Sequence, residues 1–278
     1  MKMFNLNSRL ARRATATIAL GLLLGAQTAM ACTVDNWTAN SNSLTPGSVI
    51  PGSPTAVSRY SGFCAMEVAP ATTAWVQDDS PGGIDRIRAR FYVRNGLSSG
   101  FSVIYRGFST TDGTGTLVTV FLNAAGTVTL VDASTGTQVQ QTSATEWTSI
   151  EIDWSQGASD GFIALSVNGQ NPAEQTGLSN AGSGLQSVRL GNLNAATGVL
   201  GFDAYESRRT TEIGRLCVGD ADGNGEIRFF DVTQIFEEVS SGGNVLAPGQ
   251  PDVDENGEVR FLDVAAAFEL VSTAVDCP

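Results

Sequence analysis

Residues 116–132 read "TLVTVFLNAAGTVTLVD", and this stretch decides the expected fold. Two runs in which apolar residues alternate with Thr flank the short segment from Asn123 to Gly126. Alternation with a period of two is typical of a half-buried strand, and Asn and Gly favour the tight turn between two strands. The stretch therefore predicts an antiparallel β-hairpin.

Segments with the same alternation occur on both sides of this hairpin. Residues 84–94, "IDRIRARFYVR", place Ile87 and Phe91 on one side of a strand and Arg86, Arg88 and Arg90 on the other. The series continues with "WTSIEIDW", "GFIALSVNG", "QSVRLGNL" and "VLGFDAYES". Many short strands with almost no helical pattern predict a mainly β fold over residues 32–209, an antiparallel two-sheet sandwich.

The later strands also carry a family resemblance. Residues 147–207 contain a Trp-led strand, a "G-x-[LI]-x-L-x-V-[ND]-G" strand and turn, an "R-[LI]-G" strand and a closing "F-D-x-[FY]". This series resembles the concanavalin A-like, laminin-G-like sandwiches of secreted bacterial proteins and implies a jelly-roll arrangement. Such sandwiches include lectins, adhesion modules, enzymes and spacers, so the resemblance concerns the fold and not the function.

Residues 1–31 have the features of a secretory signal peptide. A basic start precedes the apolar core "TIALGLLLGA", and "AMA" stands directly before Cys32. A lipoprotein signal is the alternative, although Ala29 occupies a position where that signal normally has Leu. We expect a secreted or extracellular protein, with the periplasm and the cell surface left open. No other segment approaches the ~20 apolar residues of a membrane helix, so no membrane span is expected.

The composition after residue 31 excludes several kinds of active site. All 28 acidic residues but only 12 of the 16 basic ones lie there, so the net charge is 12 − 28 = −16. This part of the chain contains neither Lys nor His. A Ser-His-Asp triad, a His-ligated zinc and a Lys Schiff base are therefore excluded, and so acidic a chain is a poor partner for nucleic acid.

Residues 217–278 differ in composition from the sandwich region. They contain 13 acidic and two basic residues, a net charge of −11. Apolar residues first show helical spacing here, at Val232, Ile235, Phe236 and Val239. We therefore expect a second, small α-helical domain over residues 210–278.

This region contains a duplicated loop. Residues 220–231, "DADGNGEIRFFD", recur as residues 252–263, "DVDENGEVRFLD", and the two copies share 12 of 20 aligned positions when the following residues are included. Both copies have Asp or Asn at positions 1, 3, 5 and 12 and Gly at position 6. A single acidic turn is common, but two copies with the same polar residues indicate a ligand.

Calcium explains every retained position. It is a hard cation that takes six to eight oxygen ligands at ~2.4 Å, whereas magnesium requires tighter geometry and zinc prefers His or thiolate. Position 7 would bind through its backbone carbonyl and the other positions through side-chain oxygens. The predicted ligands of two calcium ions are Asp220, Asp222, Asn224, Glu226 and Asp231 in the first copy and Asp252, Asp254, Asn256, Glu258 and Asp263 in the second.

The duplicated loops, each followed by one helix and each with Asp at position 12, resemble the type I dockerin module. The resemblance covers roughly residues 217–277 and implies two calcium ions and a cohesin partner. The sequence departs from the family at loop positions 10 and 11, where small hydroxyl residues are common and this chain has Phe229–Phe230 and Phe261–Leu262. Two partners are therefore expected for the module, a cohesin-like protein or the chain's own sandwich.

The four cysteines allow three disulfide pairings. Disulfides are expected in an exported chain. Cys32–Cys64 and Cys217–Cys277 are favoured, because each pair then lies within one predicted domain.

One strand raises the possibility of an enzyme. Glu151 and Asp153 in "EIDW" lie on the same face of a strand, as do the carboxylates of laminarinase-like glycoside hydrolases. Ser155 and Gln156 stand where that family has its second Glu, so the proton donor is missing and no catalytic residue is assigned. We expect a non-catalytic protein that acts in carbohydrate binding or extracellular assembly around polysaccharide. A glycoside hydrolase, or an accessory subunit in polysaccharide degradation, is the alternative.

Overall fold

The computed structural model describes residue 34 and residues 36–41, 49–51, 59–273 and 277. These residues belong to one compact unit, Ala31–Pro278, and within the described parts it contains fourteen strands and two helices. The predicted signal peptide, residues 1–31, lies outside the described residues. The predicted domain boundary between residues 209 and 210 stays a prediction.

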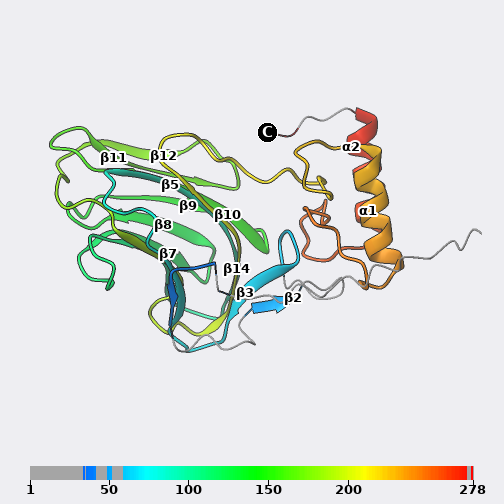
Figure 1. Ribbon diagram of the computed structural model, residues 1–278, viewed down its shortest axis with the longest axis horizontal. Coiled ribbons are helices and arrows are strands. Elements are labelled where there is room, and N and C mark those ends of the chain that lie inside the picture. Colours follow the sequence, from blue (N-terminus) through cyan, green and yellow to red (C-terminus); the bar gives the residue numbers. More distant parts are fainter. Residues whose placement is uncertain (1–33, 35, 42–48, 52–58, 274–276, 278) are drawn as a thin grey trace, which may run out of the picture. The chain divides into compact units, whose positions relative to one another are not determined.

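The strands form two antiparallel sheets of seven strands each in the described residues (Figure 1). The first sheet contains, in spatial order, β1 (Ala39–Asn40), β4 (Ala74–Asp78), β13 (Ser187–Asn192), β6 (Phe101–Phe108), β7 (Thr116–Asn123), β8 (Thr127–Asp132) and β9 (Gln138–Thr142). The second contains β12 (Ala173–Leu178), β11 (Gly161–Val167), β10 (Trp147–Ser155), β5 (Arg86–Leu97), β14 (Gly198–Arg208), β3 (Cys64–Val68) and β2 (Val49–Pro51).

The predicted hairpin is confirmed. Strands β7 and β8 pair antiparallel with Val120 opposite Leu130. The turn is closed by the Gly126 N–H, which donates to the Asn123 carbonyl at 3.0 Å. Gly126 has φ 82°, a left-handed conformation that a residue with a Cβ rarely adopts, so the glycine is required for this turn.

The apolar sides of the two sheets share one core. Phe91 of β5 and Tyr105 of β6 stack across it with ring centroids 5.6 Å apart. Side chains from both sheets are fully buried, among them Val76, Ile104, Val120, Leu130, Ile150, Ile152 and Leu165. A mainly β fold of two antiparallel sheets is therefore confirmed.

Strand β5 departs from simple alternation. Its predicted inner residues, including Ile87 and Phe91, are buried as expected. Arg90 and Tyr92 on the other side are buried as well. Tyr60 stacks on Tyr92 with ring centroids 3.7 Å apart, and the Arg90 guanidinium lies over the Tyr92 ring, 5.6 Å from its centroid. The outer face of the sheet is therefore covered here.

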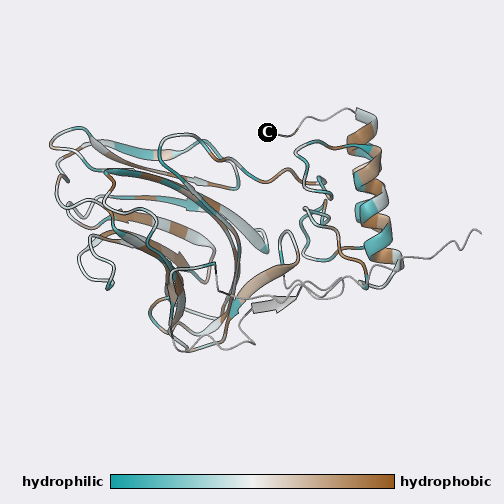
Figure 2. Ribbon diagram, in the orientation of Figure 1, coloured by the Kyte–Doolittle hydropathy of each residue, from teal (hydrophilic) through white to brown (hydrophobic). Residues whose placement is uncertain are grey.

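The two helices are α1 (Phe229–Ser240) and α2 (Phe261–Thr273), where the helical region was expected. Val232 and Ile235 of α1 are buried, as their spacing predicts. Phe236 has the same helical spacing, but its side chain is 48% exposed. Glu238 is buried, although it is charged. Hydrophobic and hydrophilic residues are mixed along the helices (Figure 2).

Within the described residues, neither helix is long and apolar enough to cross a membrane.

Candidate metal centre

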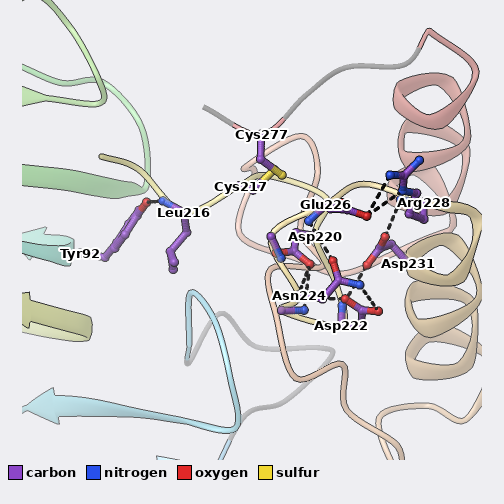
Figure 3. Close-up of a disulfide and its surroundings, with 12 residues drawn as sticks. Tyr92, Leu216, Cys217, Asp220, Asp222, Asn224, Glu226, Arg228, Asp231 and Cys277 are labelled. Atoms are coloured by element: carbon purple, nitrogen blue, oxygen red, sulfur yellow. Dashed lines mark hydrogen bonds and ion pairs between the residues drawn. A yellow bond between two sulfur atoms is a disulfide. The ribbon is translucent and has the colours of Figure 1, made fainter. Parts of the chain in front are cut away.

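The first loop, residues 220–231, brings three of its predicted ligands together. The carboxylates of Asp220, Asp222 and Asp231 each offer an oxygen within 4.8 Å of the others (Figure 3). Asn224 lies beside them, and its Nδ2 donates to Asp222 Oδ2 at 2.8 Å. The side chain of Glu226 points to Arg228 and not to the cluster, which agrees with the expectation that position 7 acts through its backbone.

The second loop, residues 252–263, repeats this arrangement. Asp252, Asp254 and Asp263 offer oxygens within the same 4.8 Å limit. Asn256 Nδ2 donates to Asp254 Oδ2 at 2.7 Å, as its counterpart does in the first loop. The side chain of Glu258 pairs with Arg260.

The backbone also repeats between the loops. The glycines at position 6, Gly225 and Gly257, have φ 88° and 93° and are left-handed. Each donates its N–H to the carboxylate at position 1, at 2.8 Å to Asp220 Oδ2 and 2.7 Å to Asp252 Oδ2. Gly at position 6 thus reverses the chain and fixes one oxygen of the first carboxylate.

The Asp at position 12 links each loop to its helix. Asp231 Oδ2 accepts the Arg228 N–H at 2.7 Å, and Asp263 Oδ2 accepts the Arg260 N–H at the same distance. An acid at the start of a helix satisfies free N–H groups there and interacts favourably with the helix dipole. Both Asp side chains are fully buried, so this position holds a charge inside the module.

The negatively charged carboxylates of the second loop repel one another. Burial, together with the nearby charges of Asp263 and Asp254, raises the pKa of Asp252 to about 7. Burial also raises the pKa of Asp263. A cation placed between these carboxylates would reverse this repulsion.

The donor set fits a hard divalent cation. Asp252 is only 7% exposed, and its Oδ1 accepts no hydrogen bond from the described residues, whereas Oδ2 accepts the Gly257 N–H. A buried carboxylate oxygen without a donor is costly unless a cation or proton satisfies it. All candidate donors are oxygens, which is the preference of calcium.

The predicted Cys217–Cys277 disulfide is confirmed. The two Cα atoms lie 5.2 Å apart and the bond closes the module just before the first loop (Figure 3). Cys64 is disulfide-bonded, but Cys32 lies outside the described residues, so the Cys32–Cys64 pairing stays a prediction.

Two side-chain contacts between the module and the sandwich were not predicted from the sequence. Arg59 Nη2 pairs with both carboxylate oxygens of Glu238 in α1, at 2.6 and 2.7 Å, and this pair is almost completely buried. Glu238 also accepts the Ala247 N–H at 2.7 Å. The repeat contained a signal for this residue, because Glu238 stands where the second copy has Leu270.

A second contact joins the second loop to the sandwich. Glu255, at position 4, accepts the Tyr60 hydroxyl at 2.9 Å and pairs with Arg215. The Leu216 N–H donates to the Tyr92 hydroxyl at 2.8 Å nearby (Figure 3). The own-sandwich partner expected for the module is thus in contact with it.

The strand that suggested an enzyme lines a cleft of about 1010 Å³ on the outer face of the second sheet. Asp153 accepts a hydrogen bond from Arg86 Nη2 at 2.7 Å, and it forms an ion pair with Arg88, whose Nε lies 2.8 Å from Asp153 Oδ2. Glu151 accepts the N–H groups of residues 213 and 214 at 3.2 and 2.8 Å. Both carboxylates are therefore held by the chain itself, and the arginine row is bridged to acids on a neighbouring strand.

No protein-family model matches the sequence, and no curated protein matches it. Several solved structures show a weak likeness. The receptor-binding domain of a botulinum neurotoxin of mosaic serotype C/D is 12% identical over 61% of this chain and 45% of that chain, with a TM-score of 0.40. The match therefore spans less than half of the neurotoxin chain.

Two further structures show a comparable likeness. The cellulose-induced protein Cip1 is 12% identical over 64% of this chain and 93% of that chain, with a TM-score of 0.44. A heptameric SAP-like pentraxin from Limulus polyphemus is 13% identical over 52% of this chain and 76% of that chain, with a TM-score of 0.39. Similarity at this level says nothing about function.

Proposed function

We propose that this chain is an exported, non-catalytic calcium-binding protein whose two C-terminal loops each bind one ion. The observation that carries the proposal is the buried Asp252 Oδ1, which has no hydrogen-bond donor among the described residues and lies within a repeated cluster of carboxylates. Repulsion within each cluster supports the same conclusion, because a divalent cation would offset it.

Calorimetric titration of the chain lacking residues 1–31 tests this proposal. We expect two calcium ions per chain, and one ion per chain for each of Asp220→Asn and Asp252→Asn. Magnesium should bind more weakly, since it requires six ligands in near-ideal octahedral geometry. Absence of calcium binding by the unaltered chain would exclude the proposal.

The module is proposed, in line with its dockerin-like sequence, to dock a protein partner on the outer face of its helices. Six large apolar side chains are more than 45% exposed there: Phe229, Phe230, Phe236, Phe261, Leu262 and Phe268. The rings pair symmetrically, Phe229 with Phe268 at 6.4 Å and Phe236 with Phe261 at 6.2 Å. Large apolar side chains that are exposed near one another are typical of an interaction site.

The net charge of −11 over residues 217–278 indicates the chemistry of this partner, an apolar centre with a basic rim. Type I cohesin modules provide a direct test by calorimetry in calcium. Binding that is lost in Phe236→Ser/Phe268→Ser would support a cohesin-like partner. Failure of every cohesin to bind would remove it.

Carbohydrate binding is the function proposed for the cleft on the sandwich. Guanidinium and carboxylate groups line it, and the Phe162 ring lies there with Arg86 over its face at 4.9 Å. Such paired charges offer donors and acceptors to sugar hydroxyls, and an aromatic ring can stack on a sugar. A glycan array probed with the unaltered chain and with Phe162→Ala tests this role.

The hydrolase alternative requires a second carboxyl group in the same cleft. Glu174 and Glu212 also line it. Release of reducing sugar from polysaccharides by the unaltered chain, abolished in Glu151→Gln, would establish the alternative in place of simple binding.

A further inference from the structure

Glu255 is the one position-4 residue of the two loops that carries a side chain. Its Oε1 accepts the Tyr60 hydroxyl at 2.9 Å and pairs with Arg215. Burial raises the pKa of Tyr60 well above its ordinary value, so the hydroxyl keeps the proton that it donates. Tyr60 belongs to the sandwich and Arg215 to the segment that leads into the first loop, so both partners lie outside the loop that contains Glu255.

Position 4 has a left-handed backbone in both loops. In the first loop it is Gly223, with φ 75°, and glycine adopts this conformation at no steric cost. In the second loop it is Glu255, with φ 53°, where the Cβ makes the same conformation unfavourable. The second loop therefore needs an external interaction to keep a shape that the first loop adopts by itself.

The carboxylates at position 1 of the two loops also differ in the hydrogen bonds that they accept from the loop backbone. Asp220 Oδ1 accepts the N–H groups of Gly223 and Asn224, at 2.8 and 3.0 Å. Asp252 Oδ1 is buried and accepts no hydrogen bond from the described residues, although its other oxygen is bonded as in the first loop. In the second loop this oxygen thus has no competing donor among the described residues and is available to a cation.

We propose that Tyr60 and Arg215 are positioning residues for calcium in the second loop, and that they raise its affinity by holding Glu255 in place. The inference rests on the proposed function, since it requires that calcium binds. In the first loop, position 4 is Gly223, which has no side chain for the sandwich to hold, and the predicted ligand side chains form hydrogen bonds within residues 220–231. Its ion should therefore bind independently of the sandwich.

The experiment isolates one loop at a time in the chain lacking residues 1–31. Asp220→Asn leaves the second loop as the calcium site, and Asp252→Asn leaves the first. Tyr60→Phe is then added to each, because it removes the hydroxyl and retains the ring that stacks on Tyr92. Calorimetric titration gives the calcium dissociation constant of all four proteins, and circular dichroism checks that each is folded.

We expect Tyr60→Phe to weaken calcium binding about tenfold when only the second loop is intact, the size typical of changes around metal ligands. It should leave binding within about twofold when only the first loop is intact. Arg215→Gln is a second variant that acts on the same carboxylate from another residue, and it should show the same selectivity.

Two results would overturn the inference and they are distinct from failure of the proposed function. Calcium binding by both loops with no effect of Tyr60→Phe or Arg215→Gln would refute the positioning role and leave the calcium proposal intact. An equal effect on both loops would also refute it, because it would indicate a general loss of stability. No calcium binding in the unaltered chain would remove both proposals together.

Discussion

The sandwich and the C-terminal module are held together by different means. Among the described residues, thirty buried residues form the sandwich core, most of them on strands of the two sheets, with large side chains such as Trp154 and Phe202 among them. The module core has five buried residues among those described, and three of them are alanines. Apolar burial is thus sufficient to explain the order of the sandwich but not that of the module.

The module replaces apolar burial with a small number of strong local constraints. It has the Cys217–Cys277 disulfide, two carboxylate clusters, the buried pair of Glu238 with Arg59 and the partly buried hydrogen bond from Tyr60 to Glu255. Small domains commonly need a disulfide or a metal because their cores are too small to offset the conformational entropy of the chain. The comparison indicates that acidic side chains help to hold the module together, where few apolar residues are buried.

Removal of calcium should have the largest effect on the difference between the sandwich and the module. In excess chelator we expect the module to lose most of its helical circular dichroism, because six loop carboxylates are then left to repel one another. The strand signal of the sandwich should persist, since its core contains no cation site in our proposal. Far-ultraviolet circular dichroism with and without chelator measures both signals in one sample.

The double variant Asp220→Asn/Asp252→Asn provides the control, because chelator should add little to a chain whose loops no longer bind the ion. Helices α1 and α2 that stay fully formed in chelator would contradict the proposed dependence on calcium.

Loss of the buried ion pair between Arg59 and Glu238 should have the next largest effect. Arg59→Met leaves the Glu238 carboxylate buried with a single remaining donor, and we expect it to lower the free energy of unfolding by about 3–5 kcal/mol. Arg94→Met is the matched control, since the pair of Arg94 with Glu146 is more than one third exposed and should change it by less than about 1 kcal/mol.

Denaturant unfolding in saturating calcium gives both values. Equal costs for the two arginine substitutions would show that the contact between module and sandwich is no more important than a surface ion pair. Adding Glu238→Gln to Arg59→Met should recover part of the loss, because it removes the unpaired buried charge.

The alternation along residues 116–132 was enough to predict the hairpin, because a strand with one buried face needs that period. The two loops could also be predicted, since their polar positions repeat along the chain. The burial of Tyr92 could not be predicted, because its ring is covered by Tyr60, which is remote in sequence. Burial set by a distant segment leaves no local pattern.

The contacts of the module with the sandwich left a signal that lies in the differences between the copies. Eight of the 20 aligned positions differ, and two of these change the charge, Gly223 against Glu255 and Glu238 against Leu270. Both charged residues at these positions contact the sandwich. The positions shared by the two copies thus predict the two calcium sites. The positions at which the charge changes mark the residues that contact the sandwich, and these residues differ between the copies.

The smallest expected effect concerns an acid of the sandwich itself. Burial raises the pKa of Asp203 to about 6, against the lowering effect of N–H groups from residues 60, 61 and 204 that it accepts. Because this value lies above the ordinary pKa of an unfolded Asp, the folded state takes up the proton first and is stabilised as the pH falls through about 6.

Between pH 8 and pH 5 this residue should therefore add about 1 kcal/mol to the free energy of unfolding, and Asp203→Asn should abolish that gain. Saturating calcium during the measurement keeps the loop carboxylates ionised, so that the difference between the two pH profiles reports Asp203 alone. Parallel profiles would mean that Asp203 has an ordinary pKa and that the module alone contains acids whose ionisation is unfavourable. A divergence of the expected size would show that the sandwich also tolerates such an acid, because its larger core offsets the cost.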